Sequence, residues 1–269
     1  MLSESGKVQQ IDKKFETDIG DISLANQFFV RLVAKDRRFT KVDFKYSIFD
    51  TCYLRNCKFD SCDFTGCRFV STNLHGSAFS GCKFDYSIFE RTLVDNEILD
   101  TECPGLENLK WAFARTLRMN YQQLGDAISA NKAISVELQA TISHKWKTWR
   151  SNESYYRKKY AGSRRVRAFF DWLSFKILDF IWGNGESAPK LVRTTIIVLL
   201  AMSLIDVVAF RDYQQLGSYL DAFRNAPKIF LGTLVPSYYW VGYLTFIVFV
   251  RLVALGLFLS IVLKRFNRR

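Results

Sequence analysis

The stretch from Phe39 to Phe89 decides the fold of the first half of the chain: FTKVDFKYSIFDTCYLRNCKFDSCDFTGCRFVSTNLHGSAFSGCKFDYSIF. Every fifth residue in it is Phe or Leu, and Val94 and Leu99 continue the series. Helices and strands return side chains to one face about every 3.6 and 2 residues, so neither explains this period. A short fixed period is typical of a solenoid, in which each repeat buries its apolar face against the next one.

A second column of mostly small residues lies two positions before each member of the Phe/Leu series. It contains Val42, Ser47, Cys52, Cys57, Cys62, Cys67, Thr72, Ser77, Cys82, Ser87 and Thr92. Five of the six cysteines therefore share one structural position, where we expect them to point inward as small buried side chains. Stacked strands lie about 4.8 Å apart, and we expect Cys62 and Cys82 to pack as thiols at that spacing, rather than as a disulfide or a metal site.

The two columns together resemble the pentapeptide-repeat family, whose repeat is small–Asp/Asn–Leu/Phe–x–x. Cys62-Asp63-Phe64 and Thr72-Asn73-Leu74 match it closely. The resemblance implies a right-handed quadrilateral β-helix in which four repeats make one square turn and residues twenty apart stack. In that register the aliphatic members Leu54, Leu74 and Val94 all fall on one of the four faces.

The repeat is expected to cover residues 39–103, about three turns, and Pro104-Gly105 marks its end. Residues 1–38 keep the spacing only at Leu24, Phe29 and Ala34, and we expect them to cap the first turn. From Phe39 to Cys103 ten acidic residues face seven basic ones. This balance is too weakly acidic and the segment too short for a DNA mimic, and no nucleic-acid partner is expected.

A helical linker is expected over 104–160, because apolar residues from Leu109 onward recur at helical spacing to about Arg150. Its apolar stripe indicates ordinary core or inter-subunit packing. The two histidines, His75 and His144, are isolated and predicted to be surface residues.

Residues 161–185 join a basic run to an aromatic-rich helix. Such a segment is typical of an interfacial helix, with cations at anionic headgroups and rings at the acyl boundary. A solvated basic face that binds RNA is the competing interpretation. The membrane-surface candidates are Arg164, Arg165, Arg167, Trp172, Lys176 and Trp182.

Two apolar stretches, at 191–210 and 241–263, each reach the roughly 20 residues that a membrane-spanning helix needs. Basic residues precede the first (Lys190, Arg193) and follow the second (Lys264, Arg265, Arg268, Arg269). The positive-inside rule therefore predicts cytoplasmic termini and an outer loop over 211–240, with an aromatic belt at Tyr238, Tyr239, Trp240 and Tyr243. The alternative is a buried hairpin of a soluble protein.

Asp206 and Arg251 are ionisable residues inside these stretches. Charges at such depth are costly, so they pair or line water. We expect Asp206 and Arg251 to pair, or Arg251 to face a pore. The alternative is that Asp206 marks the outer end of a shortened first span.

The loop 219–237 has the layout of a pore-loop channel: a short amphipathic helix over Tyr219–Leu231 and then Gly232-Thr233-Leu234-Val235-Pro236. The C-terminal half thereby resembles bacterial proteins that join pentapeptide repeats to a two-helix ion-channel-like domain. The pore or gate candidates are Phe230, Gly232, Thr233, Leu234, Val235, Pro236, Asp206 and Arg251. Potassium filters need a Thr-Val-Gly-Tyr-Gly motif, which is missing here, so potassium selectivity is not expected.

The sequence thus predicts a homo-oligomeric pore or channel of the bacterial inner membrane, tetrameric by analogy, with a cytosolic β-helix head that senses or docks a protein partner. The alternative is a membrane-anchored scaffold without ion conduction. No cleavable secretory signal is predicted at Met1–Gln10. No enzymatic motif, cofactor or metal site is expected, because no phosphate-binding loop, metal-ligand spacing or nucleophile elbow occurs.

Overall fold

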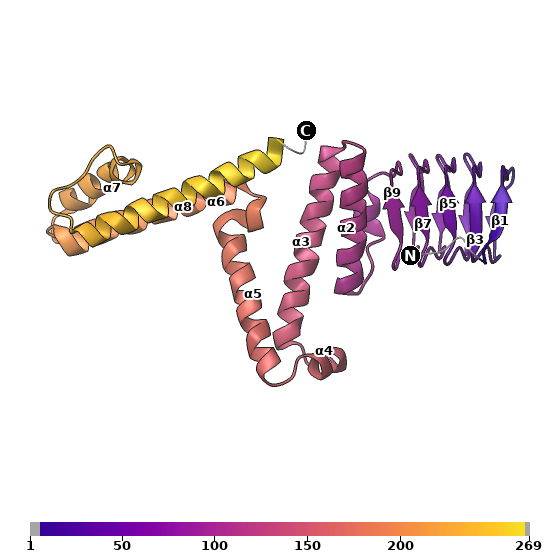
Figure 1. Cartoon of the computed structure of the whole chain (residues 1–269), viewed down its shortest axis with the longest axis horizontal. Helices are drawn as coiled ribbons and strands as arrows, with labels where there is room; N and C mark the ends of the chain where they lie inside the picture. The colour runs from indigo at the N-terminus through magenta and orange to yellow at the C-terminus, as the bar shows by residue number, and fades with distance from the viewer. Residues whose placement is uncertain (1–5, 267–269) are drawn as a thin grey trace. The chain divides into compact units, whose positions relative to one another are not determined.

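The computed structural model describes residues 6–266, without the side chains of residues 265 and 266. The chain forms two compact units, one up to Phe169 and one from Phe170 onward. The N-terminal unit begins with short strands and continues with helices (Figure 1). Its strands are β1 (Val8–Ile11), β2 (Ile19–Gly20), β3 (Gln27–Val30), β4 (Arg38–Thr40), β5 (Ile48–Asp50), β6 (Lys58–Asp60), β7 (Arg68–Val70), β8 (Ala78–Ser80) and β9 (Ile88–Glu90).

The strands wind into a parallel solenoid, which confirms the predicted β-helix. Odd-numbered strands form one sheet, β1-β3-β5-β7-β9, and even-numbered strands form another, β2-β4-β6-β8. Phe39 is in register with Phe59, and Phe59 with Phe79, so one coil takes twenty residues. The Phe44 and Phe64 rings stack with centroids 5.1 Å apart and planes 5° apart. Stacked rings on successive coils thus fill the core.

The solenoid begins earlier than predicted. Residues 8–38 are coils of the solenoid and not a separate cap, so it has about four turns and not three; residues 1–5 lie outside the described part. Ile19 is in register with Phe39, but Val8 pairs with Gln27, only nineteen residues away. The first coil is therefore one residue short, and this shift hides the period of five in the sequence.

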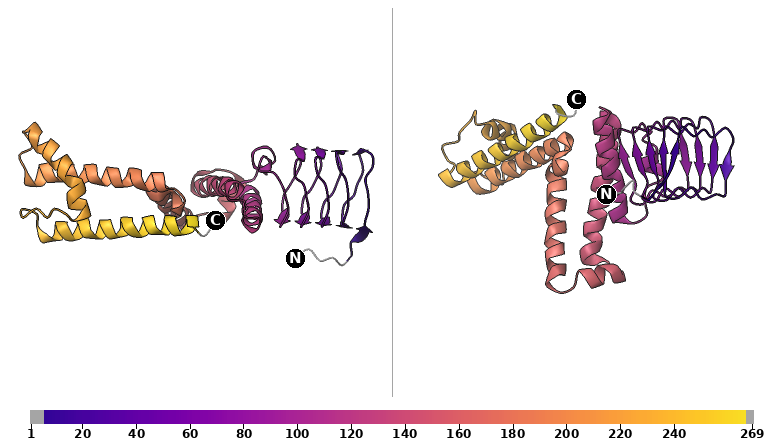
Figure 2. Two further views of the ribbon diagram at one scale, coloured as in Figure 1. Left: turned by 90° about the horizontal axis from the view of Figure 1, so that it is seen from above. Right: turned by 45° about the vertical axis from the view of Figure 1, so that its right-hand side comes forward.

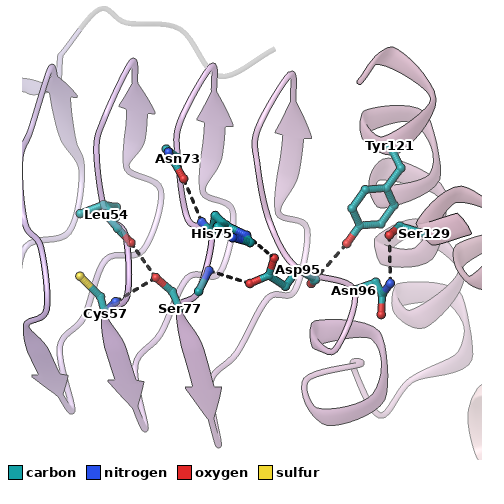
Figure 3. Close-up of polar contacts among 10 residues, drawn as sticks. Leu54, Cys57, Asn73, His75, Ser77, Asp95, Asn96, Tyr121 and Ser129 are labelled. Atoms are coloured by element: carbon teal, nitrogen blue, oxygen red, sulfur yellow. Dashed lines mark hydrogen bonds and ion pairs between the residues drawn. The ribbon is translucent and has the colours of Figure 1, made fainter. Parts of the chain in front are cut away.

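The small-residue column ties each coil to the one before it. The Cys52 thiol donates to the Phe29 carbonyl and the Cys67 thiol to the Phe44 carbonyl, each 23 residues upstream. Ser77 uses its hydroxyl in the same way on the Leu54 carbonyl, at 2.6 Å, and accepts from the Cys57 amide (Figure 3). Small donors recur at this column because each one satisfies a buried carbonyl.

Four helices complete the N-terminal unit: α1 (Ile98–Thr101), α2 (Glu107–Gln123), α3 (Ala127–Arg150) and α4 (Ser154–Lys159). The predicted continuous helix is broken at Gly125, whose φ is 75°, and Asp126 caps α3 by accepting from the Ser129 amide. Helix α2 then packs against the last coil, next to β9 (Figure 1). It is a lid on the solenoid and not only a linker.

Side chains of the lid satisfy the backbone of the last coil. The Phe113 ring lies 5.7 Å from Phe84, and Thr116 Oγ1 accepts from the Phe89 amide at 3.0 Å. Glu102 Oε2 likewise accepts from the Cys82 amide at 2.6 Å. An open strand edge would leave these amides unpaired, so the lid closes the solenoid against further pairing.

The C-terminal unit contains the end of α5 (Ser163–Trp182), the short helix η1 (Gly183–Gly185), α6 (Ala188–Phe210), α7 (Leu216–Leu231) and α8 (Val241–Phe266). Helices α6 and α8 cover the two apolar stretches of the sequence. By length and composition both are able to cross a membrane. Only small parts of their surfaces are buried within the chain, so most of their apolar side chains face outward.

Candidate functional site

Helix α7 packs into the hairpin that α6 and α8 form, near the end where α6 finishes and α8 begins (Figure 2). Ile229 and Phe230 of its last turn belong to one apolar cluster with Met202 of α6 and Ile247 of α8. Ala226 and Ala222, one and two turns earlier, are buried as well, because small side chains let α7 approach α6 closely. The last turn of α7 is thereby fixed between the two long helices.

The end of α7 reaches well inside the hairpin. Gly232 ends the helix with a φ of 82°, in the left-handed region that favours glycine. A Cβ atom at Gly232 would overlap with Nη1 of Arg251, so the guanidinium rests directly on this glycine. Arg251 stands ten residues after Val241, about 15 Å along α8. The segment from Gly232 to Trp240 must therefore lead back to the end of the hairpin where α8 begins.

Asp206 pairs with Arg211 and not, as predicted, with Arg251. Its Oδ2 lies 2.8 Å from Nε of Arg211, and Asp206 is only 1 % exposed. Arg211 also donates through Nη2 to the Tyr238 hydroxyl at 2.8 Å. Because Arg211 follows α6 directly, it bends back over the last turns of that helix. Arg211 is only five residues from Asp206 in the sequence, and the predicted pairing with Arg251 is wrong.

An aromatic stack closes the end of the hairpin where α6 finishes and α8 begins. The Phe210 ring lies 4.7 Å from Tyr239 and 5.6 Å from Tyr243. Of the predicted aromatic belt, Tyr239 and Tyr243 are thus buried in packing, while Tyr238 and Trp240 are exposed. Together with the Arg211–Tyr238 hydrogen bond, this stack joins the two ends of the segment that carries α7.

The five-residue loop after α7 is largely exposed in the single chain. The Thr233 amide and hydroxyl both donate to the Lys228 carbonyl, as does the Leu234 amide. Gly232 to Val235 are accessible and Pro236 is buried. The predicted pore candidates from Phe230 to Pro236 therefore lie together. Phe230 is packed into the hairpin, and Gly232 to Val235 are exposed.

An apolar cavity of about 180 Å³ lies between α6 and α8 on the far side of Phe230. Val198, Val250 and Ala254 are among its lining residues, and none of its lining residues is charged. The two long helices are therefore in tight contact through α7 at one end and spaced apart further along.

The predicted membrane-surface residues lie along α5. Arg164, Arg165, Arg167 and Lys176 are exposed, whereas Trp172 and Trp182 are half-buried. Arg165 also donates to the Trp149 carbonyl at 2.7 Å, so part of its charge serves the N-terminal unit. Exposed Val166, Phe170, Ile177 and Phe180 accompany these cations along the helix.

A sharp elbow joins α5 to α6. Gly183, Asn184 and Gly185 all have positive φ angles, between 53° and 87°. Lys264 near the end of α8 lies 3.5 Å from Glu186, the residue that follows this elbow. The predicted basic flank continues beyond it, but Arg268, Arg269 and the side chain of Arg265 lie outside the described residues.

The family model for pentapeptide repeats matches this chain at residues 38–76 and 47–85, with eight copies. This decides the nature of the solenoid. Residues 38–85 are pentapeptide repeats. The match covers less than a fifth of the sequence, and it says nothing about the helices that follow.

Solved structures resemble only part of this chain. A pentapeptide repeat protein of the Arabidopsis thaliana thylakoid lumen is 12 % identical, with a TM-score of 0.19, over 29 % of this chain and 72 % of its own. QnrB1, a plasmid-mediated fluoroquinolone resistance protein, is 13 % identical in one trypsin-treated form, with a TM-score of 0.16, over 34 % of this chain and 62 % of its own. No curated protein matches the chain.

A short polar network lies on the outer surface of the solenoid near its C-terminal end. His75 Nδ1 lies 2.7 Å from Asp95 Oδ1, and Asp95 Oδ2 accepts from the Gly76 amide at 2.7 Å (Figure 3). These residues link the last two coils on one face. Among the described residues, no group of three or more His, Cys, Asp or Glu side chains is placed to hold a metal ion.

His144 is not the surface residue that was predicted. It lies in α3, half-buried, with Nδ1 3.3 Å from the hydroxyl of Tyr156 in α4. Burial, together with the nearby Lys159, lowers the pKa of His144 below its usual value. This contact fixes α4 against α3.

Proposed function

We propose that the chain is one subunit of an oligomeric membrane pore, with the pentapeptide-repeat solenoid as a cytosolic head that senses or docks a protein partner. The observation that carries this proposal is the path of α7, which ends beside Arg251, about 15 Å into α8, before the chain returns to Trp240. A helix that enters between two apolar helices and a loop that leads out again form the layout of a pore loop.

Two further features support a membrane location. Both α6 and α8 are long and apolar enough to span, and they expose large side chains such as Val208, Phe249 and Leu252. The cations and exposed rings of α5 suit an anionic bilayer surface just before the first span. We place both termini on the cytoplasmic side of the bacterial inner membrane, because basic residues flank both spans there.

A single hairpin cannot enclose a conduit, so the pore requires several copies around a rotation axis. The accessible residues from Gly232 to Val235 are available to line that axis. Their sequence lacks the second glycine of a potassium filter, so the conduit is not selective for potassium. Phe230 and Leu234 are then candidates for an apolar constriction.

Flux through vesicles that contain the full-length protein tests this proposal. The Leu234→Cys variant should conduct, and a charged methanethiosulfonate reagent should block its flux. Leu200→Cys is the matched control, because Leu200 is an apolar residue of α6 that is similarly exposed and lies outside the loop. The native cysteines form part of the background for both variants, and wild-type protein treated with the reagent measures it.

Absence of flux for all of these proteins, also with a head-binding partner present, would exclude the pore and favour a membrane-anchored pentapeptide-repeat scaffold. Equal block at Leu200→Cys and Leu234→Cys would show that the loop does not line the conduit. A ring-shaped particle in detergent is expected, and a monomeric one would contradict the proposal.

A further inference from the structure

Arg251 has no acidic partner within the part of the chain that the structure describes. The acidic residues with partners in the C-terminal unit bind other cations: Asp206 pairs with Arg211, Asp179 with Lys190 and Glu186 with Lys264. Arg251 is nevertheless half-buried and lies deep along an apolar helix. A charge in such a position needs a compensating group, because it is costly in an apolar medium.

The C-terminal end of α7 lies next to Arg251. The last four carbonyls of a helix lack partners within it, and the helix end carries about half a negative elementary charge. Gly232 and the two residues after it donate back to Lys228 and Ile229. The Phe230 and Leu231 carbonyls accept no hydrogen bond from backbone N–H groups that lie outside the helices and strands of the described chain. The Arg251 guanidinium lies against Gly232, immediately beyond these two residues.

We infer that Arg251 is a positioning residue for the pore loop, which anchors the C-terminal end of α7, and that its charge sets the preference of the conduit for anions over cations. The first part rests on the contact with Gly232 alone. The second part rests on the proposed pore function, because it requires ions to pass this helix end.

The sign of the preference follows from two opposing charges at one place. Without Arg251, the negative end of α7 would attract cations to the middle of the conduit. A full positive charge at the same place outweighs the partial negative one, and the net field favours anions. Lys228 is a poor substitute, because its side chain is exposed and lies one turn back on α7.

Hydrogen–deuterium exchange of the full-length protein in nanodiscs tests the anchoring without any need for conduction. In Arg251→Gln, the amides of Gly232, Thr233 and Leu234 should exchange about tenfold faster than in the wild type. Gly232→Ala should also speed this exchange with the charge retained, because the added Cβ displaces the guanidinium and the left-handed backbone strains an alanine. Lys228→Gln is the matched control, and it should leave these amides nearly unchanged. Unchanged exchange in Arg251→Gln would overturn the anchoring, whatever the result for Gly232→Ala.

Reversal potentials in asymmetric KCl test the charge preference. The reversal potential of the wild-type protein should have the sign of the chloride equilibrium potential. Arg251→Lys and Lys228→Gln should keep that sign, and Arg251→Gln should change it. Measurable currents with one reversal potential in all four proteins would overturn the role in selectivity. Faster exchange in Arg251→Gln without current in any protein would support the anchoring and overturn the pore, so the two failures are distinguishable.

Discussion

Asn120 of α2 is hydrogen-bonded to both backbone groups of Thr92 on the last coil of the solenoid. Its Oδ1 accepts from the Thr92 amide and its Nδ2 donates to the Thr92 carbonyl, each at 2.7 Å. Asn120 is fully buried. One amide side chain thus takes the place of the peptide group that a further coil would have supplied, and the repeat ends without an open edge.

Replacing Asn120 by alanine should therefore loosen the end of the solenoid. The change leaves a buried donor and a buried acceptor of Thr92 unsatisfied, at a cost of about 3 kcal/mol. We expect the Thr92 amide to exchange with deuterium roughly a hundredfold faster in the full-length protein. Gln122→Ala, an exposed change on the same helix, serves as the control, and an equal effect of both changes would refute the role of Asn120.

Removing the arginine of the Asp206–Arg211 ion pair should cost more folding free energy than removing both partners. In Arg211→Gln the buried Asp206 carboxylate loses its countercharge, and the expected destabilisation is about 3–5 kcal/mol. Asp206→Asn combined with Arg211→Gln should recover most of this loss. Thermal midpoints of the detergent-solubilised protein measure the difference, with the exposed Arg224→Gln as control. A double variant no more stable than Arg211→Gln alone would contradict the pair.

The contact between α3 and α4 should weaken in acid. Burial lowers the pKa of His144, so below about pH 6.5 the unfolded chain takes up this proton before the folded one does. The contribution of His144 is therefore present above that pH and is lost as the pH falls through its lowered folded value. Glu107 opposes this shift, while Lys145, Lys147 and Lys159 add to it.

Thermal midpoints at pH 7.5 and pH 5 in wild type and His144→Phe isolate this contribution. The variant keeps a ring beside Tyr156 but cannot take up the proton, so its midpoint should fall less between the two pH values. Equal losses in both proteins would rule out His144 as the titrating group.

The solenoid thiols should resist alkylation while the chain is folded. Burial raises the pKa of Cys52 to about 12 and also raises that of the fully buried Cys67, which leaves little thiolate at neutral pH. Cys103 is only half-buried, so we expect it to react first, although its pKa is raised as well. Mass spectrometry after brief maleimide treatment, compared with urea-unfolded protein, measures the order. Rapid labelling of Cys67 in the folded chain would show that the coils open readily.

The regular part of the fold could be predicted from the sequence because each coil places the same kinds of residue at the same inward positions. Leu54 and Leu74 fell on one face, and every fifth side chain pointed inward, since coils of twenty residues stack without offset. The first coil was missed because one residue is absent between Phe15 and Ile19, although Ile19 itself keeps the period counted back from Phe39.

The contacts that the sequence did not predict are those without a period. Asn120 meets Thr92 across 28 residues, and Arg251 meets Gly232 only because α7 enters the hairpin. The Asp206–Arg211 pair was missed for a different reason: Arg211 lies just outside the apolar stretch 191–210, and only ionisable residues inside the two stretches were predicted to pair. The loop, its neighbouring helix and the apolar stretches were anticipated from composition and spacing, which do not determine side-chain partners.

The constant step from Phe39 to Phe59 to Phe79 makes length an adjustable property of this protein. Duplicating or deleting one block of twenty residues would return every inward ring to its column and change the reach of the head by about 4.8 Å. Neither the shortened first coil nor the asparagine-bearing lid would need to change. Gene duplication can therefore alter how far the head extends in fixed increments, while both of its ends stay as they are.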